Sequence, residues 1–106
     1  TTDHGTINVN KPSRVIGDRG VNTNLRYKQG KNLDFQKEDV LEIDKPLECY
    51  LPIQNVSSKY IFAKENRYFV YQNNFNHYVK LYKNTYQHGG ISMEEMLIPV
   101  ITLKSK

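Results

Sequence analysis

Two short groups of residues, near opposite ends of the 106-residue sequence, have side chains suited to metal chemistry. Asp3-His4-Gly5 joins a carboxylate and an imidazole to a glycine, and His88-Gly89-Gly90 sets an imidazole before two glycines. Both side-chain types are common zinc ligands. Neighbouring strand residues point to opposite faces, so Asp3 and His4 can meet one ion only where a strand becomes a loop, a turn that Gly5 permits. On spacing alone, an Asp-His dipeptide is most often a surface turn.

Longer motifs around both groups resemble the last metal motifs of the alkaline phosphatase superfamily. They are Thr2-Asp3-His4-Gly5 and the tail His88-Gly89-Gly90-Ile91-Ser92-Met93-Glu94-Glu95-Met96-Leu97-Ile98-Pro99. The stretches Gly17-Asp18-Arg19, Asn22-Thr23-Asn24-Leu25-Arg26-Tyr27-Lys28 and Asn76-His77-Tyr78 resemble in particular the PglZ domain. That domain ends PorX-like response regulators, which carry a receiver domain and are linked to type IX secretion in Bacteroidetes.

The resemblance implies an α/β fold, in which the chain is the C-terminal segment of an alkaline-phosphatase-like α/β/α sandwich. It also implies a hydrolase of phosphate esters with two zinc ions, a pair that stabilises the charge of in-line displacement. Carried over residue by residue, Asp3 and His4 bind one ion and His88 binds the other. The family's nucleophile and remaining ligands precede the first motif. Residues 1–106 are therefore expected to be the C-terminal portion of a single PglZ domain, with no catalytic nucleophile among them.

A count of ligands agrees with this expectation. A catalytic zinc ion usually has three protein ligands, so two ions need about six, and the sequence offers three strong candidates. We therefore expect the 106-residue chain alone to be inactive and its parent protein to be a metal-dependent phosphoric ester hydrolase. The expected partners are a phosphodiester or nucleotide substrate, the rest of the domain, a receiver domain and sensor kinase in the parent protein, and a second copy in a homodimer.

Several basic residues and one histidine are candidate substrate contacts. Arg19, Arg26 and Lys28 lie in a basic stretch after the first metal motif, where they could bind phosphate oxygens. His77 could face the same site. The alternatives stay open, because a charged loop is often only solvated and a lone histidine is more often structural. Tyr27 could stack on a base, whereas the aromatic residues of 59–71 are better explained by packing.

Composition restricts the setting of the protein. The 15 basic and 11 acidic side chains give a net charge of +4, which suits phosphate-bearing partners. No apolar run approaches the ~20 residues of a membrane helix. The single cysteine, Cys49, excludes an internal disulfide and fits a reducing compartment, so we expect a cytoplasmic protein without a membrane partner. The other function class that composition permits is a non-catalytic module that binds nucleic acid or protein, with a structural or decayed metal site.

The elements that must position these residues are only partly visible in the sequence. Residues 5–33 are rich in Gly, Asn, Lys and Arg, which favours a long loop. Residues 39–51 predict a short helix or strand ending before Pro46. Residues 59–63 and 67–71 predict a β-hairpin. A short helix or irregular segment is expected over 75–86, a capped helix from Ser92, and a terminal strand at 100–103.

Overall fold

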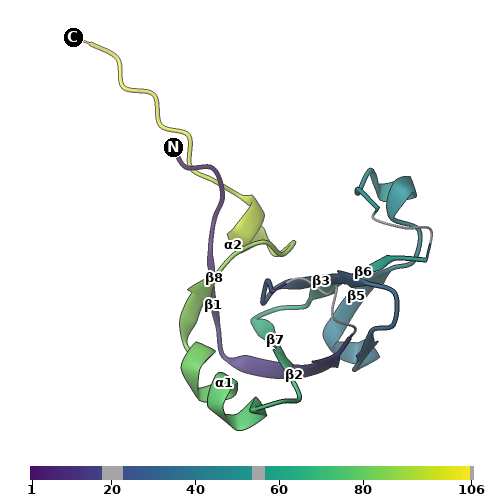
Figure 1. Ribbon diagram of the computed structural model, residues 1–106. Coiled ribbons are helices and arrows are strands. Elements are labelled where there is room, and N and C mark those ends of the chain that lie inside the picture. The colour runs from purple at the N-terminus through teal and green to yellow at the C-terminus, as the bar shows by residue number, and fades with distance from the viewer. Residues whose placement is uncertain (18–22, 54–56, 106) are drawn as a thin grey trace.

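The computed structural model describes residues 1–17, 23–53 and 57–105. Over these residues the chain has a mixed α/β architecture of three small sheets and two α-helices. Its two ends leave the body of the molecule together, as two extended segments on the same side (Figure 1). In the part of the chain that the structure describes, no helix is both long and apolar enough to cross a membrane.

The three sheets join segments that lie far apart in the sequence. The first pairs β1 (Ile7–Val9) with β8 (Thr85–Gln87), antiparallel. The second has the order β4 (Asp34–Phe35), β2 (Lys11–Ile16) and β7 (Arg67–Tyr71). The third has the order β3 (Tyr27–Gly30), β6 (Lys59–Ala63) and β5 (Val40–Ile43). The other elements are the 3₁₀-helices η1 (Lys37–Asp39) and η2 (Pro46–Cys49) and the α-helices α1 (Phe75–Tyr82) and α2 (Met93–Met96).

Strand β7 lies between two hydrophobic clusters. Phe69 belongs to one cluster, which also contains Val15 and Ile61, whereas Tyr68 and Val70 belong to the other. Successive strand residues point to opposite faces, so a strand that is buried on both faces can serve two cores. This explains why Tyr68, Phe69 and Val70 are consecutive apolar residues rather than an alternating pattern.

Helix α1 closes the second of these clusters. Its side chains Phe75, Val79 and Tyr82 pack against that cluster. The Tyr68 hydroxyl donates a hydrogen bond of 2.8 Å to the Val79 carbonyl, which ties the helix to β7. The prediction of a short helix or irregular segment over 75–86 is confirmed for 75–82, whereas residues 85 and 86 belong to β8.

The predicted hairpin over 59–71 has the right strands but the wrong pairing. Strands β6 and β7 occupy the predicted ranges 59–63 and 67–71. However, β6 pairs with β3 and β5, and β7 pairs in parallel with β2, so the two are not partners. The turn between them contains Glu65 with φ of 52°. A short turn signal shows that the chain reverses there, and it does not identify the strand that each half pairs with.

Two further expectations about secondary structure are wrong. Residues 5–33 contain β1, β2 and β3 instead of a long loop. The polar sequence hid β2, because only Ser13 and Val15 on its inner face are buried. The expected terminal strand at 100–103 is an extended segment without a ladder partner among the described residues, and Val100, Ile101 and Leu103 are 76–90% exposed.

Candidate metal and loop-anchoring site

The fold brings the two candidate metal groups together from opposite ends of the chain. The rings of His4 and His88 stack with their centroids 4.0 Å apart and an angle of 17° between their planes. The pairing of β1 with β8, in which Ile7 is opposite Gln87, sets this approach, because both histidines lie just beyond that ladder. Asp3 and His88 are exposed and His4 is half-buried. The three residues therefore form one accessible cluster.

The donor atoms of Asp3 and His4 are arranged suitably for one ion. His4 Nδ1 is 2.9 Å from the Gly5 carbonyl oxygen, so the tautomer that donates there leaves Nε2 as the metal-binding nitrogen. His4 Nε2 lies 3.6 Å from Asp3 Oδ1. Ligand atoms of a tetrahedral zinc ion are about 3.3 Å apart. A small adjustment would therefore bring both donors onto one zinc ion.

Asp3, His4 and His88 do not by themselves form a complete metal site. Among the described residues, no three His, Cys, Asp or Glu side chains converge closely enough to hold a metal ion. The His88 ring, stacked on that of His4, places a further imidazole beside the Asp3–His4 pair. The donor set thus fits part of a two-ion centre.

Helix α2 connects the two loops that carry the candidate metal ligands, residues 3–5 and 88–90, which are called the metal loops below. The Gly5 amide donates a hydrogen bond of 2.8 Å to the Glu95 carbonyl. A Cβ atom at Gly5 would lie 1.9 Å from the Glu94 carbonyl oxygen, a backbone atom that cannot move aside independently. Glycine at position 5 therefore allows the first metal motif to pass directly against α2, as well as permitting the turn expected from the sequence.

The Glu95 side chain holds the second metal loop. Its carboxylate accepts hydrogen bonds from the amides of Gly90 and Ser92, at 3.2 and 3.1 Å, and from the Ser92 hydroxyl at 2.8 Å. The capping box predicted from the sequence is present, with Ser92 as the N-cap of α2. A Cβ atom at Gly90 would lie 2.5 Å from a carboxylate oxygen of Glu95. The His-Gly-Gly loop therefore wraps around this one side chain.

A buried arginine completes the anchor. Arg26 binds Glu95 through two hydrogen bonds, Nε to Oε1 at 2.6 Å and Nη2 to Oε2 at 3.1 Å, and also donates to the Arg67 carbonyl. Both side chains are at most 1% exposed. Burial alone raises the pKa of Glu95, but the hydrogen bonds from Arg26 and Ser92 outweigh it and lower that pKa overall. Glu95 is thus held as a carboxylate.

Asn24 makes a second connection to the same loop. Its side-chain Nδ2 donates to the His88 carbonyl oxygen at 3.2 Å, while Oδ1 accepts from the Arg26 amide at 2.7 Å. Gly89, which follows His88, has φ of 99° and packs against the Asn24 amide. Asn24 and Arg26 therefore fix the backbone that carries His88.

The candidate substrate contacts are widely separated in the structure. Arg26 is fully buried and bound to Glu95, so its geometry gives it an anchoring role in place of phosphate binding. Lys28 is buried with its Nζ 4.6 Å from the centre of the Tyr71 ring. His77 is exposed on α1, edge-on to Tyr78. Arg19 lies outside the described residues. For Tyr27, the structure favours packing over stacking on a base, since its ring centre lies 6.1–6.3 Å from those of Tyr60 and Phe62.

Only part of this anchor is predictable from the sequence. The spacing of Ser92 and Glu95 predicted their mutual bonds. No local signal links Arg26 to Glu95, which is 69 positions away.

Comparison with known proteins defines the class of the chain. Residues 1–103 match the family described as the BREX system PglZ alkaline phosphatase-like domain. The chain therefore belongs to the PglZ family of alkaline phosphatase-like domains. Among curated proteins, no sequence matches the chain.

Proposed function

We propose that this chain supplies part of the metal centre of a zinc-dependent phosphodiesterase or phosphatase. Asp3 and His4 bind one zinc ion in this proposal, and His88 binds a second. The observation that carries it is the 4.0 Å stacking of His4 on His88, within a member of an alkaline phosphatase-like family. When bound, such ions stabilise the negative charge that develops on the phosphoryl oxygens.

The residues of this chain act chiefly by positioning. Glu95 holds the backbone of both metal loops, through its carbonyl to Gly5 and its carboxylate to Gly90. Arg26 keeps that carboxylate charged and in place, and Asn24 holds the His88 carbonyl. Two histidines on otherwise flexible, glycine-containing loops are thereby kept at a fixed separation. Ligands held this way before the metal binds lose less conformational entropy on binding.

The substrate that best fits the composition is a nucleotide or oligonucleotide phosphodiester. The net charge of +4 favours a phosphate-bearing partner. The proposal extends to a cytoplasmic parent protein, a response regulator coupled to secretion, in which a receiver domain and sensor kinase control the phosphodiesterase. This regulatory part is supported by the resemblance of the motifs to PorX-like proteins.

The experiment is a diester hydrolysis assay on the full-length protein that contains these 106 residues. Bis(p-nitrophenyl) phosphate serves as the substrate, with and without a chelator. We expect chelation and His88→Ala each to lower the rate at least about 100-fold, because removing the metal or one of its ligands removes charge stabilisation in the transition state. His77→Ala, an exposed histidine outside the cluster, is the matched control. Hydrolysis that survives both chelation and His88→Ala would contradict the proposal.

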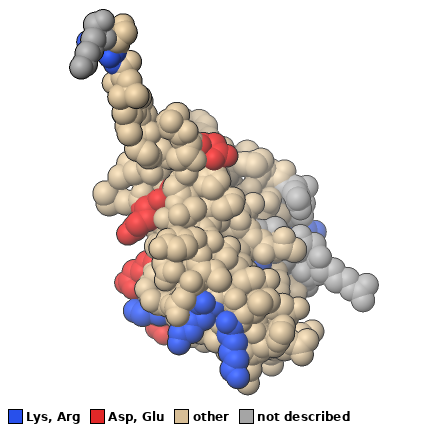
Figure 2. Space-filling model, turned by 90° about the vertical axis from the view of Figure 1, so that its left-hand side faces the viewer, with Lys and Arg blue, Asp and Glu red and all other residues tan. Residues whose placement is uncertain are grey.

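The other function class, a binding module without catalysis, has weaker support. On the face shown in Figure 2, basic side chains gather at the end away from the projecting tail, and acidic side chains lie along one edge and near the base of the tail. A nucleic-acid-binding groove usually tracks the phosphate backbone with a continuous basic surface, which this face does not show. Salt-sensitive RNA binding that persists after chelation would favour this alternative.

A further inference from the structure

A run of apolar residues near the C-terminus is exposed to solvent. Residues 97–103 read Leu-Ile-Pro-Val-Ile-Thr-Leu and contain no charged side chain. Leu97 is 64% exposed, and Val100, Ile101 and Leu103 are 76–90% exposed. The run is too short for a membrane helix, which takes about 20 residues. Consecutive apolar residues without polar alternation are instead typical of a strand that is buried on both faces.

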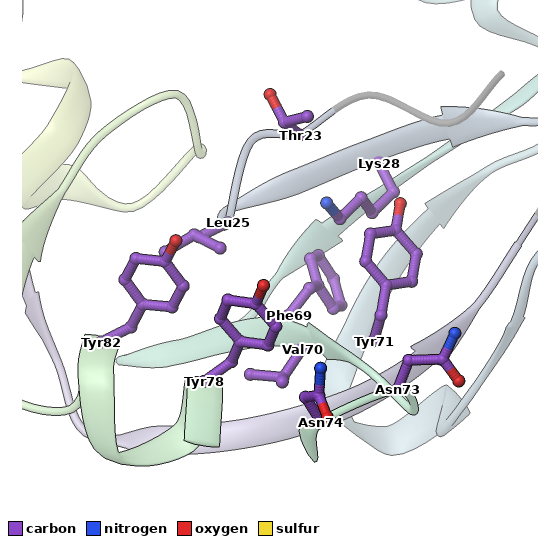
Figure 3. A pocket seen from close by; sticks show the side chains of 10 residues that line it. All are labelled: Thr23, Leu25, Lys28, Phe69, Val70, Tyr71, Asn73, Asn74, Tyr78 and Tyr82. Atoms are coloured by element: carbon purple, nitrogen blue, oxygen red, sulfur yellow. The ribbon is translucent and has the colours of Figure 1, made fainter. Parts of the chain in front are cut away.

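The aromatic side chains beside α1 are also partly exposed, but they have partners within the fold. Tyr78 and Tyr82 stack with their ring centroids 6.0 Å apart, and Lys28 Nζ lies 4.6 Å from the centre of the Tyr71 ring. Together these side chains line a pocket of about 420 Å³ between α1 and β7 (Figure 3). Residues 100–103 differ, because they have no ladder partner among the residues that the structure describes.

Two contacts set the register between the two ends of the chain. The Gly5 amide donates to the Glu95 carbonyl at 2.8 Å, and the Thr1 hydroxyl donates to the Pro99 carbonyl at 2.6 Å. One segment therefore advances as the other recedes by the same number of positions, which is the relation between antiparallel strands. Figure 1 shows the purple N-terminal segment beside the yellow C-terminal one, which continues past the N-terminus.

Extending this register predicts what lies beside the exposed run. In both contacts the position numbers add to 100, so the residue directly before Thr1 in a longer chain falls opposite Val100. The second residue before Thr1 falls opposite Ile101, and the fourth falls opposite Leu103. Pro99, which has no amide hydrogen, lies at the first position of such a strand, where a ladder tolerates proline. The geometry of the two ends therefore selects one particular neighbour.

We propose that residues 100–103 dock a β-strand, and that this strand is the polypeptide directly before Thr1 in the full-length protein. The pairing is antiparallel and continues the register of residues 1–5 with 95–99. It rests on the proposed function in one respect, that residues precede Thr1, and it does not depend on zinc. Within residues 1–106 alone, the exposed run buries little surface.

The docked strand holds the first metal loop at its N-terminal end. Asp3 and His4 lie between Thr1 and Gly5, the two residues that bond to the C-terminal segment. Helix α2 fixes the loop at Gly5, and the strand pair fixes the chain that enters the loop at Thr1. Ligands whose loop is fixed at both ends lose less conformational entropy when they bind.

Hydrogen exchange of the full-length protein, read by mass spectrometry, tests the pairing. We expect the amides of residues 101–103 to exchange at least about 100-fold more slowly than in a free peptide of the same sequence, with or without a chelator. Ile101→Pro, which removes an amide from the ladder, should abolish this protection, whereas Ser105→Pro, beyond the run, should leave it unchanged. Exchange at the rate of the free peptide would overturn the proposal. Because the readout involves neither metal nor hydrolysis, that result would leave the zinc centre standing.

A pair of cysteines identifies the occupant and its register. In the full-length protein, Ile101→Cys is combined with a cysteine at the second residue before Thr1, and the exposed Cys49 is replaced by serine. We expect a disulfide within one chain, because directly opposed strand residues lie within the Cα distance that a disulfide spans. Leu97→Cys, exposed in the same run but out of register, is the matched control and should not form the bond. Equal bonding of both, or no bond, would contradict the register. A bond only between chains would assign the surface to a second copy and refute the proposal.

Discussion

Glu95 is the residue on which both metal loops depend. Its carbonyl holds Gly5 and its carboxylate holds Gly90 and Ser92, although the side chain is almost completely buried. A buried carboxylate is costly unless it is paired, and Arg26 provides the pair. The ion pair therefore fixes the backbone of the two loops that carry His4 and His88 to the interior of the fold.

We predict that Glu95→Gln lowers the free energy of unfolding by about 3–5 kcal/mol, because it leaves the Arg26 charge buried without its partner. Urea unfolding measures the change. Glu94→Gln, an exposed neighbour on the same helix, should change stability by less than about 0.5 kcal/mol. Equal effects of the two substitutions would show that the buried pair does not anchor α2.

The same ion pair predicts that the stability of the folded chain falls at acid pH. The pKa of Glu95 is lower in the folded chain than its ordinary value of 4.5, so its stabilising effect is complete above pH 4.5. As pH falls below 4.5 toward the folded pKa, the unfolded chain takes up the proton first and this stabilisation is lost. Urea unfolding between pH 3 and 6 should show a steeper acid loss in the original protein than in Glu95→Gln. Parallel curves would contradict the assigned shift.

Lys28 predicts a second pH dependence, at alkaline pH. Its pKa is lowered to about 8 from 10.5, so between these values the unfolded chain binds more protons than the folded one. Stability should therefore rise as pH increases from 8 toward 10, relative to Lys28→Met, in which that contribution is absent. Thermal unfolding of both proteins across this range measures the difference. A difference between the two that is constant with pH would show that Lys28 is not desolvated.

At the scale of elements, the approach of the first metal motif to α2 is the critical contact. Gly5→Ala places a methyl group against the Glu94 carbonyl, so we predict a loss of about 1–3 kcal/mol in unfolding free energy. The altered spacing should also separate the rings of His4 and His88, which NMR of their ring protons can follow. Thr6→Ala, at the exposed next position, is the control and should be neutral. An unchanged histidine pair in Gly5→Ala would contradict the proposed close fit.

The sequence predicted the features that depend on neighbouring residues and missed those that depend on residues far apart in the chain. The capping box at Ser92 and the strands at 59–63 and 67–71 are local patterns, and the structure contains them. The pairing of β7 with β2 and of Arg26 with Glu95 depends on positions more than 50 residues apart, for which a single sequence carries no local signal. The candidate metal ligands were proposed from their motifs, and the approach of His4 to His88 requires the β1–β8 ladder, which was not predicted.

At the scale of the whole molecule, the chain has two small cores joined by β7 and a projecting C-terminal segment (Figure 1). Val100, Ile101 and Leu103 in that segment are exposed. We predict that removing residues 100–106 changes the unfolding free energy by less than about 0.5 kcal/mol, because little surface is buried there. Urea unfolding of the shortened and original chains tests this. A loss of several kcal/mol would show that the segment packs on the body in solution.

Metal analysis tests whether Asp3, His4 and His88 take part in a zinc centre. The measurement is the zinc content of the full-length protein by mass spectrometry, for the original sequence, His88→Ala and His77→Ala. We predict about two zinc ions per chain in the original protein and in His77→Ala, and a loss of at least one ion in His88→Ala. A protein without bound zinc, or a His88→Ala variant with an unchanged zinc content, would contradict the account.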